Sequence, residues 1–399
     1  MSKSSWVLLV GTSFSAVPIL HTLQAAGWAV AVCGNHPSDP CVAQADAYYQ
    51  LDYSNHEQLL ALVKREGFGY LCPSCNDYAY LSAAYVANSL GLPGFDAPNN
   101  IEVIANKASF RSFAHAAGLP VPRVWQLEFE RELIQYPVLV KPVDSFSGRG
   151  VTKVLSSLGL DVAIAEAQEE SRSQRYVVEQ FIEGSLHSHS AFIQEGKIAF
   201  DFFVDEYCQA YPYQVDCSHH PSQLPQEARG QLRALIQQMV QSLGLVDGLL
   251  HTQFMFSPDG PILIESMRRC PGDLYYHLIH LSTGQAYLQH YVAPFLGQTT
   301  RVVPSAVERF WMRHTLSQAK DSIYIGVNTQ LDGWKGFKVF PLLEAGQIVK
   351  AAPFGKAAIA FIEVSSFAEM VEQTPRLADR FQGSFMSPEL GMQLDAGDC

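Results

Sequence analysis

The sequence predicts a mixed fold, α/β in its first part and α+β afterwards, divided among three domains. Through residues 1–97, short apolar runs alternate with amphipathic helical segments, which is typical of a doubly wound parallel sheet. Residues 98–300 carry hairpin patterns and two small α+β lobes, and residues 301–399 read as a small β-rich domain. A chain of 399 residues is also too long for one ordinary hydrophobic core.

Glycine and turn residues bound the elements of the first domain. Its first turn, Gly11-Thr12-Ser13, has one glycine where a dinucleotide-binding fingerprint has three, which argues against an NAD(P) oxidoreductase. We expect strands at residues 6–10, 29–33, 48–51 and 70–72, and helices at residues 17–26, 56–66 and 78–90.

A linker is expected at residues 93–100, where the first domain meets the second, and a single helix at residues 101–117. A strong amphipathic helix is expected at residues 226–243, and a late helix at residues 367–372. The remaining elements are strands at residues 138–141, 151–155 and 176–179, a helix at residues 160–170, and hairpins pairing 190–193 with 198–203 and 249–256 with 262–265.

Composition narrows the classes of function. The net charge of −12 disfavours a nucleic-acid partner, whose phosphates require a basic face. No stretch approaches the roughly 18–20 uninterrupted apolar residues of a membrane span. The eight cysteines are scattered, which fits a reducing cytoplasm, and Cys72-Pro73-Ser74-Cys75 is a lone CxxC that we interpret as two small apolar residues at a strand end.

Five motifs follow one another through the middle of the chain. They contain two lysines of the buried type, a small-residue loop, a carboxylate after a strand, and an acidic pair followed by arginine, the groups that a polyphosphate and a metal ion need. The motifs are Asn106-Lys107-Ala108-Ser109-Phe110-Arg111, Pro137-Val138-Leu139-Val140-Lys141-Pro142, Ser145-Phe146-Ser147-Gly148-Arg149-Gly150-Val151, Val177-Val178-Glu179-Gln180-Phe181-Ile182-Glu183-Gly184, and Gln253 with Glu265-Ser266-Met267-Arg268-Arg269.

The order and spacing of these motifs resemble the ATP-grasp superfamily, and within it the carboxylate–amine or L-amino-acid ligase branch, with a core similar to carbamoyl-phosphate synthetase and biotin carboxylase. The resemblance covers nearly the whole chain. It implies a pre-ATP-grasp domain at 1–97, a two-lobed ATP-grasp core at 98–300, and a terminal β-rich domain at 301–399. It also implies ATP with Mg²⁺, for which Mn²⁺ is an alternative.

The resemblance assigns the nucleotide contacts residue by residue. Lys107 and Lys141 would bind the phosphates, and the loop with Ser145, Ser147, Gly148 and Gly150 would cover the γ-phosphate as a lid. Glu179, Gln180, Phe181 and Ile182 would hold the adenine, and His187, eight residues past Glu179, would contact the ribose.

Gln253 and Glu265 face each other across the second expected hairpin and are the candidate metal ligands. Relatives often carry a metal-binding Asn where this chain has Met267, so the completion of a second metal site is left open. Arg269 would hold the substrate carboxylate and the transferred phosphoryl group, with Lys141 as the other catalytic cation. Arg268 is expected to point the other way.

Several polar residues keep two interpretations. Asp77 matches an acidic position common in such N-terminal domains, or caps the helix that follows it. Asp273 contacts a substrate amine, or caps a helix. The segment 213–225, with His219 and His220, falls where the amino-acid ligase branch lines its acceptor pocket.

The resemblance implies an ATP-dependent ligase that forms a C–N bond through an acyl phosphate, acting on a small-molecule carboxylate and amine. A homodimer is compatible with the sequence. One alternative is another ATP-grasp chemistry, bicarbonate carboxylation or ligation of a purine intermediate. A second is a degenerate ATP-binding regulator, which Gln253 and Met267 motivate.

Overall fold

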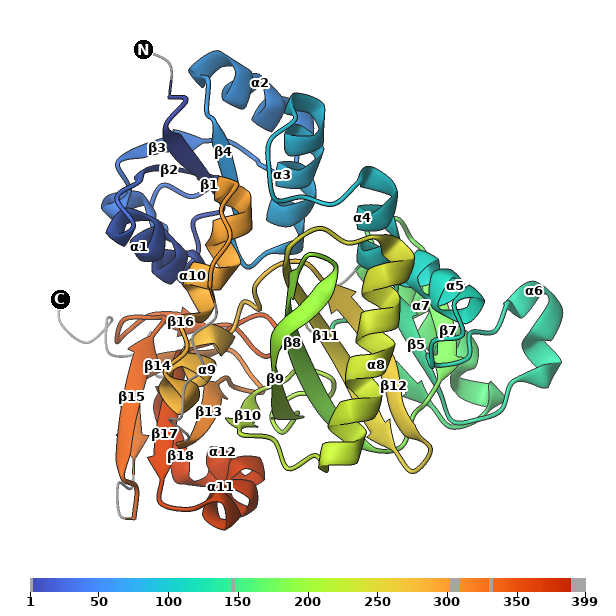
Figure 1. The fold of residues 1–399 in the computed structure, drawn as a ribbon. Coiled ribbons are helices and arrows are strands. Elements are labelled where there is room, and N and C mark those ends of the chain that lie inside the picture. The colour runs from blue at the N-terminus through green and yellow to red at the C-terminus, as the bar shows by residue number, and fades with distance from the viewer. Residues whose placement is uncertain (1–2, 145–147, 302–308, 330–332, 389–399) are drawn as a thin grey trace.

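The computed structural model describes residues 3–144, 148–301, 309–329 and 333–388. In these ranges the chain forms an N-terminal parallel sheet, a small three-stranded lobe, a large antiparallel sheet and a three-stranded C-terminal sheet (Figure 1). The mixed α/β and α+β class predicted from the sequence is confirmed. No helix within the described ranges is long and apolar enough to cross a lipid bilayer.

The N-terminal sheet is parallel and has the order β3-β2-β1-β4, so its central strands are covered by helices on both faces. The central strands β1 and β2 consist mainly of Val, Leu, Ala and Cys, because both of their faces are buried. The elements are β1 (Trp6–Val10), α1 (Val17–Ala25), β2 (Ala29–Gly34), β3 (Ala47–Gln50), α2 (His56–Glu66), β4 (Tyr70–Pro73) and α3 (Asp77–Leu90).

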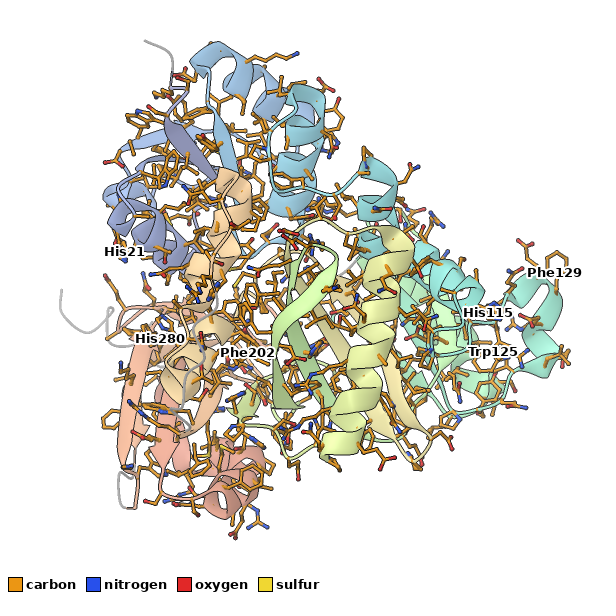
Figure 2. All side chains as sticks on the ribbon, in the orientation of Figure 1. His21, His115, Trp125, Phe129, Phe202 and His280 are labelled. Atoms are coloured by element: carbon orange, nitrogen blue, oxygen red, sulfur yellow. The ribbon has the colours of Figure 1, made fainter. Side chains whose placement is uncertain are left out.

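The small lobe lies to one side of the molecule, at the right of Figure 1. Its central strand β5 is buried along its whole length between β6 and β7, and α7 packs on the sheet. Trp125 belongs to this lobe's core, whereas Phe129 on α6 protrudes from its outer end with 78% of its surface exposed (Figure 2). The elements are α6 (Leu127–Glu130), β5 (Val138–Pro142), β6 (Thr152–Val154), α7 (Leu160–Glu170) and β7 (Tyr176–Gln180).

The large sheet has eight strands in the order β12-β11-β8-β9-β10-β13-β17-β15. Helix α8 packs its apolar stripe, including Leu232 and Ile236, on one face of this sheet. The elements are β8 (Ser185–Gln194), β9 (Lys197–Tyr207), β10 (Cys217–His220), α8 (Gln226–Leu243), β11 (Gly248–Ser257), β12 (Gly260–Met267), β13 (Phe310–Leu316), β15 (Gly336–Pro341) and β17 (Ala358–Val364).

The C-terminal strands divide between two sheets. β13, β17 and β15 continue the large sheet, because β10 pairs with β13 from Cys217 opposite His314 to His220 opposite Trp311. The domain boundaries at residues 97 and 300 stay predictions. The second sheet has the order β16-β14-β18, and the remaining elements are α9 (Tyr275–Thr283), α10 (Tyr287–Val292), β14 (Ser322–Thr329), β16 (Ile348–Val349), α11 (Phe367–Gln373), α12 (Leu377–Arg380) and β18 (Phe381–Met386).

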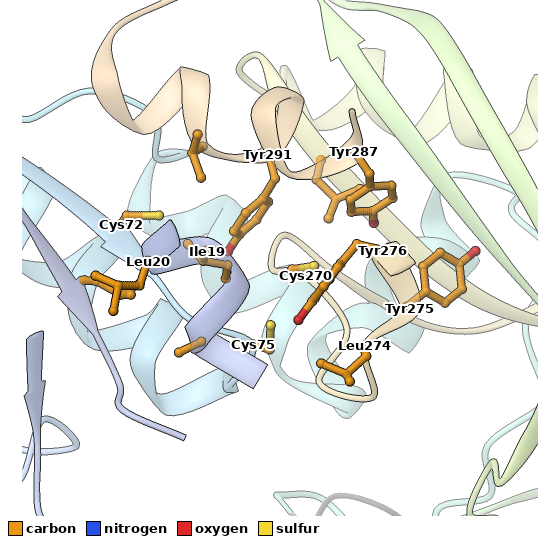
Figure 3. Packing of buried hydrophobic residues seen from close by; sticks show 14 of the residues in the cluster. Ile19, Leu20, Cys72, Cys75, Cys270, Leu274, Tyr275, Tyr276, Tyr287 and Tyr291 are labelled. Carbon is orange, nitrogen blue, oxygen red and sulfur yellow. The ribbon is translucent and has the colours of Figure 1, made fainter. Parts of the chain in front are cut away.

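One hydrophobic cluster joins the N-terminal sheet to the large sheet through α9 and α10 (Figure 3). Tyr276 donates its hydroxyl to the carbonyl of Ser15 at 3.2 Å, and Tyr291 donates to that of Pro73 at 2.9 Å. Both cysteines of the CxxC sequence are buried free thiols, which agrees with their interpretation as small apolar residues. The cluster also includes Ile19, Leu20, Cys72, Cys75, Cys270, Leu274, Tyr275 and Tyr287.

The prediction of a linker at residues 93–100 followed by a single helix at residues 101–117 is wrong. Two helices occupy the region, α4 (Pro98–Ala105) and α5 (Lys107–Ala116), so α4 takes the end of the expected linker. Asn106 has the extended angles φ −100° and ψ 120°, and its side chain caps α5 by accepting from the backbone N–H groups of Ala108 and Ser109. This break makes Lys107 the first residue of α5.

We predict that Asn106→Ala destabilises the protein by about 1 kcal/mol, because α5 then loses the side-chain acceptor at its N-terminus. Urea unfolding measures the change in the free energy of unfolding. Asn99→Ala on the exposed side of α4 is the matched control and should change it by less than about 0.5 kcal/mol. Equal losses in the two variants would contradict the capping role.

Candidate active site

One cleft of about 1440 Å³ lies among the N-terminal sheet, the small lobe, the large sheet and the C-terminal segment. On the N-terminal side it is lined by residues that follow the carboxyl ends of the parallel strands, among them Ser13, Asn35 and Asn76. This is the edge at which open α/β sheets bind ligands. Most of the sequence-predicted residues line the same cleft: Lys107, Lys141, Gly148, Glu179, Gln180, Phe181, Ile182, His187, Gln253, Glu265 and Arg269.

A buried ion cluster lies at the small-lobe end of the cleft. Glu179, only 1% exposed on β7, accepts from Lys141 on the adjacent strand β5 through one carboxylate oxygen. Its other oxygen accepts from Nε and Nη2 of Arg111 at 3.1 and 3.0 Å. Arg111 had no role expected from the sequence, although it lies four residues after Lys107 and therefore on the same side of α5.

The charges of this cluster hold its carboxylate ionised. Burial by itself would raise the pKa of Glu179, but Lys141 and Arg111 outweigh burial and lower that pKa to about 2. Both oxygens of Glu179 are therefore engaged by cations, and its expected contact with adenine stays a prediction.

Lys107 lines the cleft at the start of α5. Burial lowers the pKa of its ammonium, the charge of Lys141 acts in the same direction, and Glu265 opposes both. The two lysines are therefore close enough to interact, and a polyanion between them would relieve their repulsion.

The glycines of the expected phosphate loop differ in position. Gly148 lines the cleft with φ +73°, and a Cβ there would lie 2.8 Å from the backbone carbonyl carbon of Tyr213. Gly150 is outside the cleft lining and packs against the side chains of Pro142 and Glu170. Ser145 and Ser147 lie outside the described residues, so their roles stay predictions.

The expected adenine segment lies where the small lobe meets the β11–β12 hairpin. Apolar side chains from both sides, Leu139 on β5 and Met255 and Ile264 on the hairpin, line the cleft together with Ile182. Such surfaces can sandwich a planar ring. Two neighbours of this slot are also held in place: the Gln180 N–H donates to the carbonyl of Arg123 at 2.8 Å, and the Lys153 ammonium lies 3.6 Å from the centre of the Phe181 ring.

His187 is buried on β8 with both ring nitrogens engaged. Its Nδ1 lies 2.7 Å from a carboxylate oxygen of Asp205, and its Nε2 lies 2.6 Å from the hydroxyl of Ser185. His187 nevertheless belongs to the cleft lining, and its contact with ribose stays a prediction.

Gln253 and Glu265 are direct partners across β11 and β12, as the sequence predicts, next to a β-bulge between Gln253 and Phe254. Gln253 donates its amide to Glu206 at 2.8 Å, which leaves its carbonyl oxygen for another partner. Oxygen donors suit Mg²⁺. Among the described residues, no group of three His, Cys, Asp or Glu side chains can hold a metal by itself.

Arg269 and Arg268 point to opposite sides, as expected. Arg269 lines the cleft and donates from Nε and Nη2 to the two carboxylate oxygens of Asp77, at 2.8 and 2.6 Å. Burial would lower the pKa of Arg269, but Asp77 raises it. Arg268 is buried and donates to Asp96 at 2.7 Å. Capping of α3 by Asp77 is wrong, because Asn76 is the cap and Asp77 is the first helical residue.

A second cluster of charged side chains lies elsewhere along the cleft. Of its members, only Asp273 was expected from the sequence. Asp273 lines the cleft and forms an ion pair with Arg313, a fully buried residue of β13, so its expected role as a helix cap is wrong. The cap position of α9 is Leu274. Lys356, from the segment before β17, and Glu206 on β9 line the cleft as well. Burial and the charge of Asp273 raise the pKa of Glu206 to about 7.

Only part of the segment at 213–225, which was expected to line an acceptor pocket, lines the cleft. Tyr213, Gln214 and Gln223 line the cleft, whereas His219 and His220 do not. His219 is buried, with Nε2 3.3 Å from a carboxylate oxygen of Asp205. Burial lowers the pKa of His220 to about 3, so its imidazole is neutral at physiological pH.

Comparison with known proteins identifies the domain. Residues 134–274 match the family described as ATP-grasp domain. The chain is 27% identical over 275 residues to the formate-dependent phosphoribosylglycinamide formyltransferase of Parasynechococcus marenigrum (strain WH8102), an alignment that covers 65% of this chain and 69% of that protein.

Solved structures share the fold over almost the whole chain. The L-amino acid ligase from Bacillus licheniformis superposes with a TM-score of 0.75 at 18% identity, covering 97% of this chain and 100% of that one. The biotin carboxylase domain of the Hydrogenobacter thermophilus 2-oxoglutarate carboxylase, solved with MgADP and bicarbonate, superposes with a TM-score of 0.75 at 16% identity, covering 95% and 90%. These structures show the fold, and the family match at residues 134–274 confirms the resemblance to the ATP-grasp superfamily.

The lowered pKa of Glu179 predicts an acid-labile contribution to stability. This contribution is complete above the carboxyl's unfolded pKa of about 4.3 and is lost as the pH falls through about 2. The difference corresponds to roughly 3 kcal/mol, which urea unfolding between pH 5 and pH 2 measures. Glu179→Gln should remove this pH dependence and, by leaving two cations uncompensated, lower stability at pH 7 by about 3–5 kcal/mol.

Glu169→Gln, at an exposed site on α7, is the control and should retain the parental pH dependence. An unchanged slope between pH 5 and pH 2 in Glu179→Gln would contradict the ion cluster.

Proposed function

We propose that this chain, which carries an ATP-grasp domain, is an ATP-dependent ligase that joins a carboxylate to an amine and releases ADP and phosphate. The observation that carries the proposal is the convergence, in one cleft, of two lysines, an oxygen-donor pair and an arginine that come from four separate segments. A cleft of about 1440 Å³ exceeds the roughly 300–1,000 Å³ of a typical single-ligand pocket, so it has room for a nucleotide and a second substrate.

The nucleotide lies with its adenine in the slot between Leu139 and the β11–β12 hairpin. Its phosphates extend past Lys141 toward Lys107, where the two ammonium groups neutralise negative charge that spreads over the phosphate oxygens during transfer. Gln253 and Glu265 would hold Mg²⁺, which would supply further charge neutralisation on the phosphates. Met267, beside this pair, has no oxygen to add.

The reaction has two displacements. A carboxylate oxygen of the first substrate attacks the γ-phosphorus and the bond to the ADP oxygen breaks, which gives an acyl phosphate. The amine nitrogen then attacks the acyl carbon, the bond to phosphate breaks, and the amine loses one proton. Arg269 aligns the carboxylate with the phosphoryl group, because guanidinium holds two oxygens in fixed geometry.

The names of the relatives support a carboxylate as one substrate, since the formyltransferase is formate-dependent and the Bacillus protein is an amino acid ligase. The formyltransferase also motivates a second candidate, ligation to a ribotide amine. A screen of ADP release with small carboxylates paired with amino acids or with phosphoribosyl amines separates the two. ATP binding without ADP release in any pairing would favour the regulatory alternative.

We predict that Lys141→Ala lowers the rate of ADP formation by at least about 100-fold, since one of two charges that stabilise the transferring phosphate is lost. Coupled spectrophotometric detection of ADP measures the rate. Lys64→Ala, an exposed lysine of α2, is the control, and thermal unfolding verifies that both variants fold. Parental turnover in Lys141→Ala would remove this lysine from the phosphate site.

Glu265→Gln should raise the Mg²⁺ concentration required for half-maximal ADP formation by about 10-fold or more, because a carboxylate ligand becomes a neutral amide. A magnesium titration at fixed ATP measures the shift. Glu195→Gln, in the exposed turn between β8 and β9, should leave the titration unaltered. Superimposable curves for Glu265→Gln and the parent would refute metal binding at this position.

A further inference from the structure

The contact between Arg269 and Asp77 joins parts of the chain that are 192 residues apart. Arg269 follows β12 at the edge of the large sheet, and Asp77 opens α3 of the N-terminal domain. Their side chains remain 13% and 24% exposed, and both line the cleft. The pair is therefore at the cleft wall and faces the space that substrates occupy.

The hydrogen bonds of Arg269 show which of its donors remain for a substrate. A guanidinium has five N–H groups. Asp77 takes Nε–H and one N–H of Nη2, and the carbonyl of Cys270 takes one N–H of Nη1 at 3.4 Å. Among the residues that the structure describes, no partner takes the second N–H of Nη1 or of Nη2, and the free N–H of Nη2 lies on the terminal edge of the planar group, between Nη1 and Nη2. That edge can still bind two oxygens of a carboxylate or phosphoryl group.

We propose that Asp77 is a positioning residue that holds Arg269 by its side edge, so that the terminal edge of the guanidinium is directed at the reacting carboxylate and phosphoryl group. This inference rests on the proposed ligase function. It assigns the N-terminal domain a part in the first chemical step, in addition to lining the cleft.

The support behind Asp77 suits this role. Asp77 is the first residue of a 14-residue helix, and Asn76 fixes that helix end by accepting from the N–H of Ala79. A carboxylate on a capped helix start has little freedom to follow a moving arginine. Catalytic groups need such rigid support, because a displacement of about 1 Å can cost roughly 100-fold in rate.

The neighbouring pair of Arg268 and Asp96 provides the contrast. Arg268 is only 4% exposed, and it donates to Asp96 and to the backbone carbonyls of Leu249 and Val246, all away from the cleft. This pair packs the same two regions of the chain together without facing substrate. If Asp77 only held the two regions together, substitutions of Asp77 and of Asp96 would have the same effects on stability and activity.

The test is Asp77→Asn, assayed by acyl-phosphate trapping. Hydroxylamine converts an acyl phosphate to a hydroxamate, so ATP-dependent hydroxamate formation reports the first step without the amine substrate. The asparagine N–H₂ would face guanidinium donors and cannot accept from both. We expect kcat for hydroxamate formation to fall about 10- to 100-fold with KM for ATP changed less than 3-fold, and Asp77→Glu to recover part of kcat.

Asp96→Asn is the matched control, and we expect it to lower Tm while leaving kcat per folded molecule near the parental value. In a double-mutant cycle, Asp77→Asn should add little to Arg269→Lys, because Asp77 acts through the guanidinium. Fully additive losses, or an Asp77→Asn variant with parental kcat, would overturn the inference.

A measurement by ¹⁵N NMR tests the contact between Arg269 and Asp77 independently of activity. We expect the parent to show a slowly exchanging Nε–H signal for Arg269, and we expect this signal to vanish in Asp77→Asn. If that signal is present and the parent forms no hydroxamate with any carboxylate, the proposed function fails while the geometry stands. If the signal is absent from the parent, the positioning inference fails by itself.

Discussion

The burial of Glu179 between Lys141 and Arg111 is the interaction on which the cleft depends. A carboxylate that is 1% exposed is tolerated only when cations compensate it, and here two do. Because the three residues lie on β7, β5 and α5, the cluster fixes the small lobe against the helix that begins with Lys107. The cluster itself keeps one excess positive charge, because one carboxylate cannot neutralise two cations. Lys107 adds a further cation that faces Glu265, and these cations favour a polyanion at the small-lobe end of the cleft even though the whole chain carries a net charge of −12.

The elements of the fold were predictable where burial follows a local period. The N-terminal strands, α2 (His56–Glu66), α7 (Leu160–Glu170) and α8 (Gln226–Leu243) agree with the sequence patterns because each presents one apolar face or run. The break between α4 and α5 at Asn106 was not predicted. An asparagine can either cap a helix or lie within one, and the apolar spacing continues on both sides of it, so the sequence does not separate the two cases. The continuation of the large sheet into β13, β17 and β15 was not predictable from periodicity, since strand order depends on pairing between distant segments.

Individual site residues were predictable from the sequence where a motif contains a residue type suited to one role, such as a lysine for phosphate or a carboxylate for a metal ion. Lys141, Gln253 and Glu265 meet in the cleft because the strands that carry them have fixed alternation and register. The partners of these residues were not predictable in the same way. The pairing of Arg269 with Asp77 spans 192 residues, and that of Asp273 with Arg313 joins a loop to a distant strand, so no spacing in the sequence encodes either. Arg111 is the exception, because its position four residues after Lys107 on one helix was visible in the sequence.

The residues that line the cleft come from the ATP-grasp segment and from the regions that flank it. Lys141, Glu179, Gln253, Glu265 and Arg269 fall within residues 134–274, the segment that matches the ATP-grasp domain. Asn35 and Tyr78 of the N-terminal domain and Lys356 of the C-terminal part line the same cleft from outside that segment. The proposed phosphoryl transfer depends on charge neutralisation and alignment, to which Lys107 and Asp77 add from outside this segment. Discrimination among substrates requires polar groups that would be left unpaired by the wrong one. In this cleft such groups come both from residues 134–274, as with Glu206 and Asp273, and from the flanking regions.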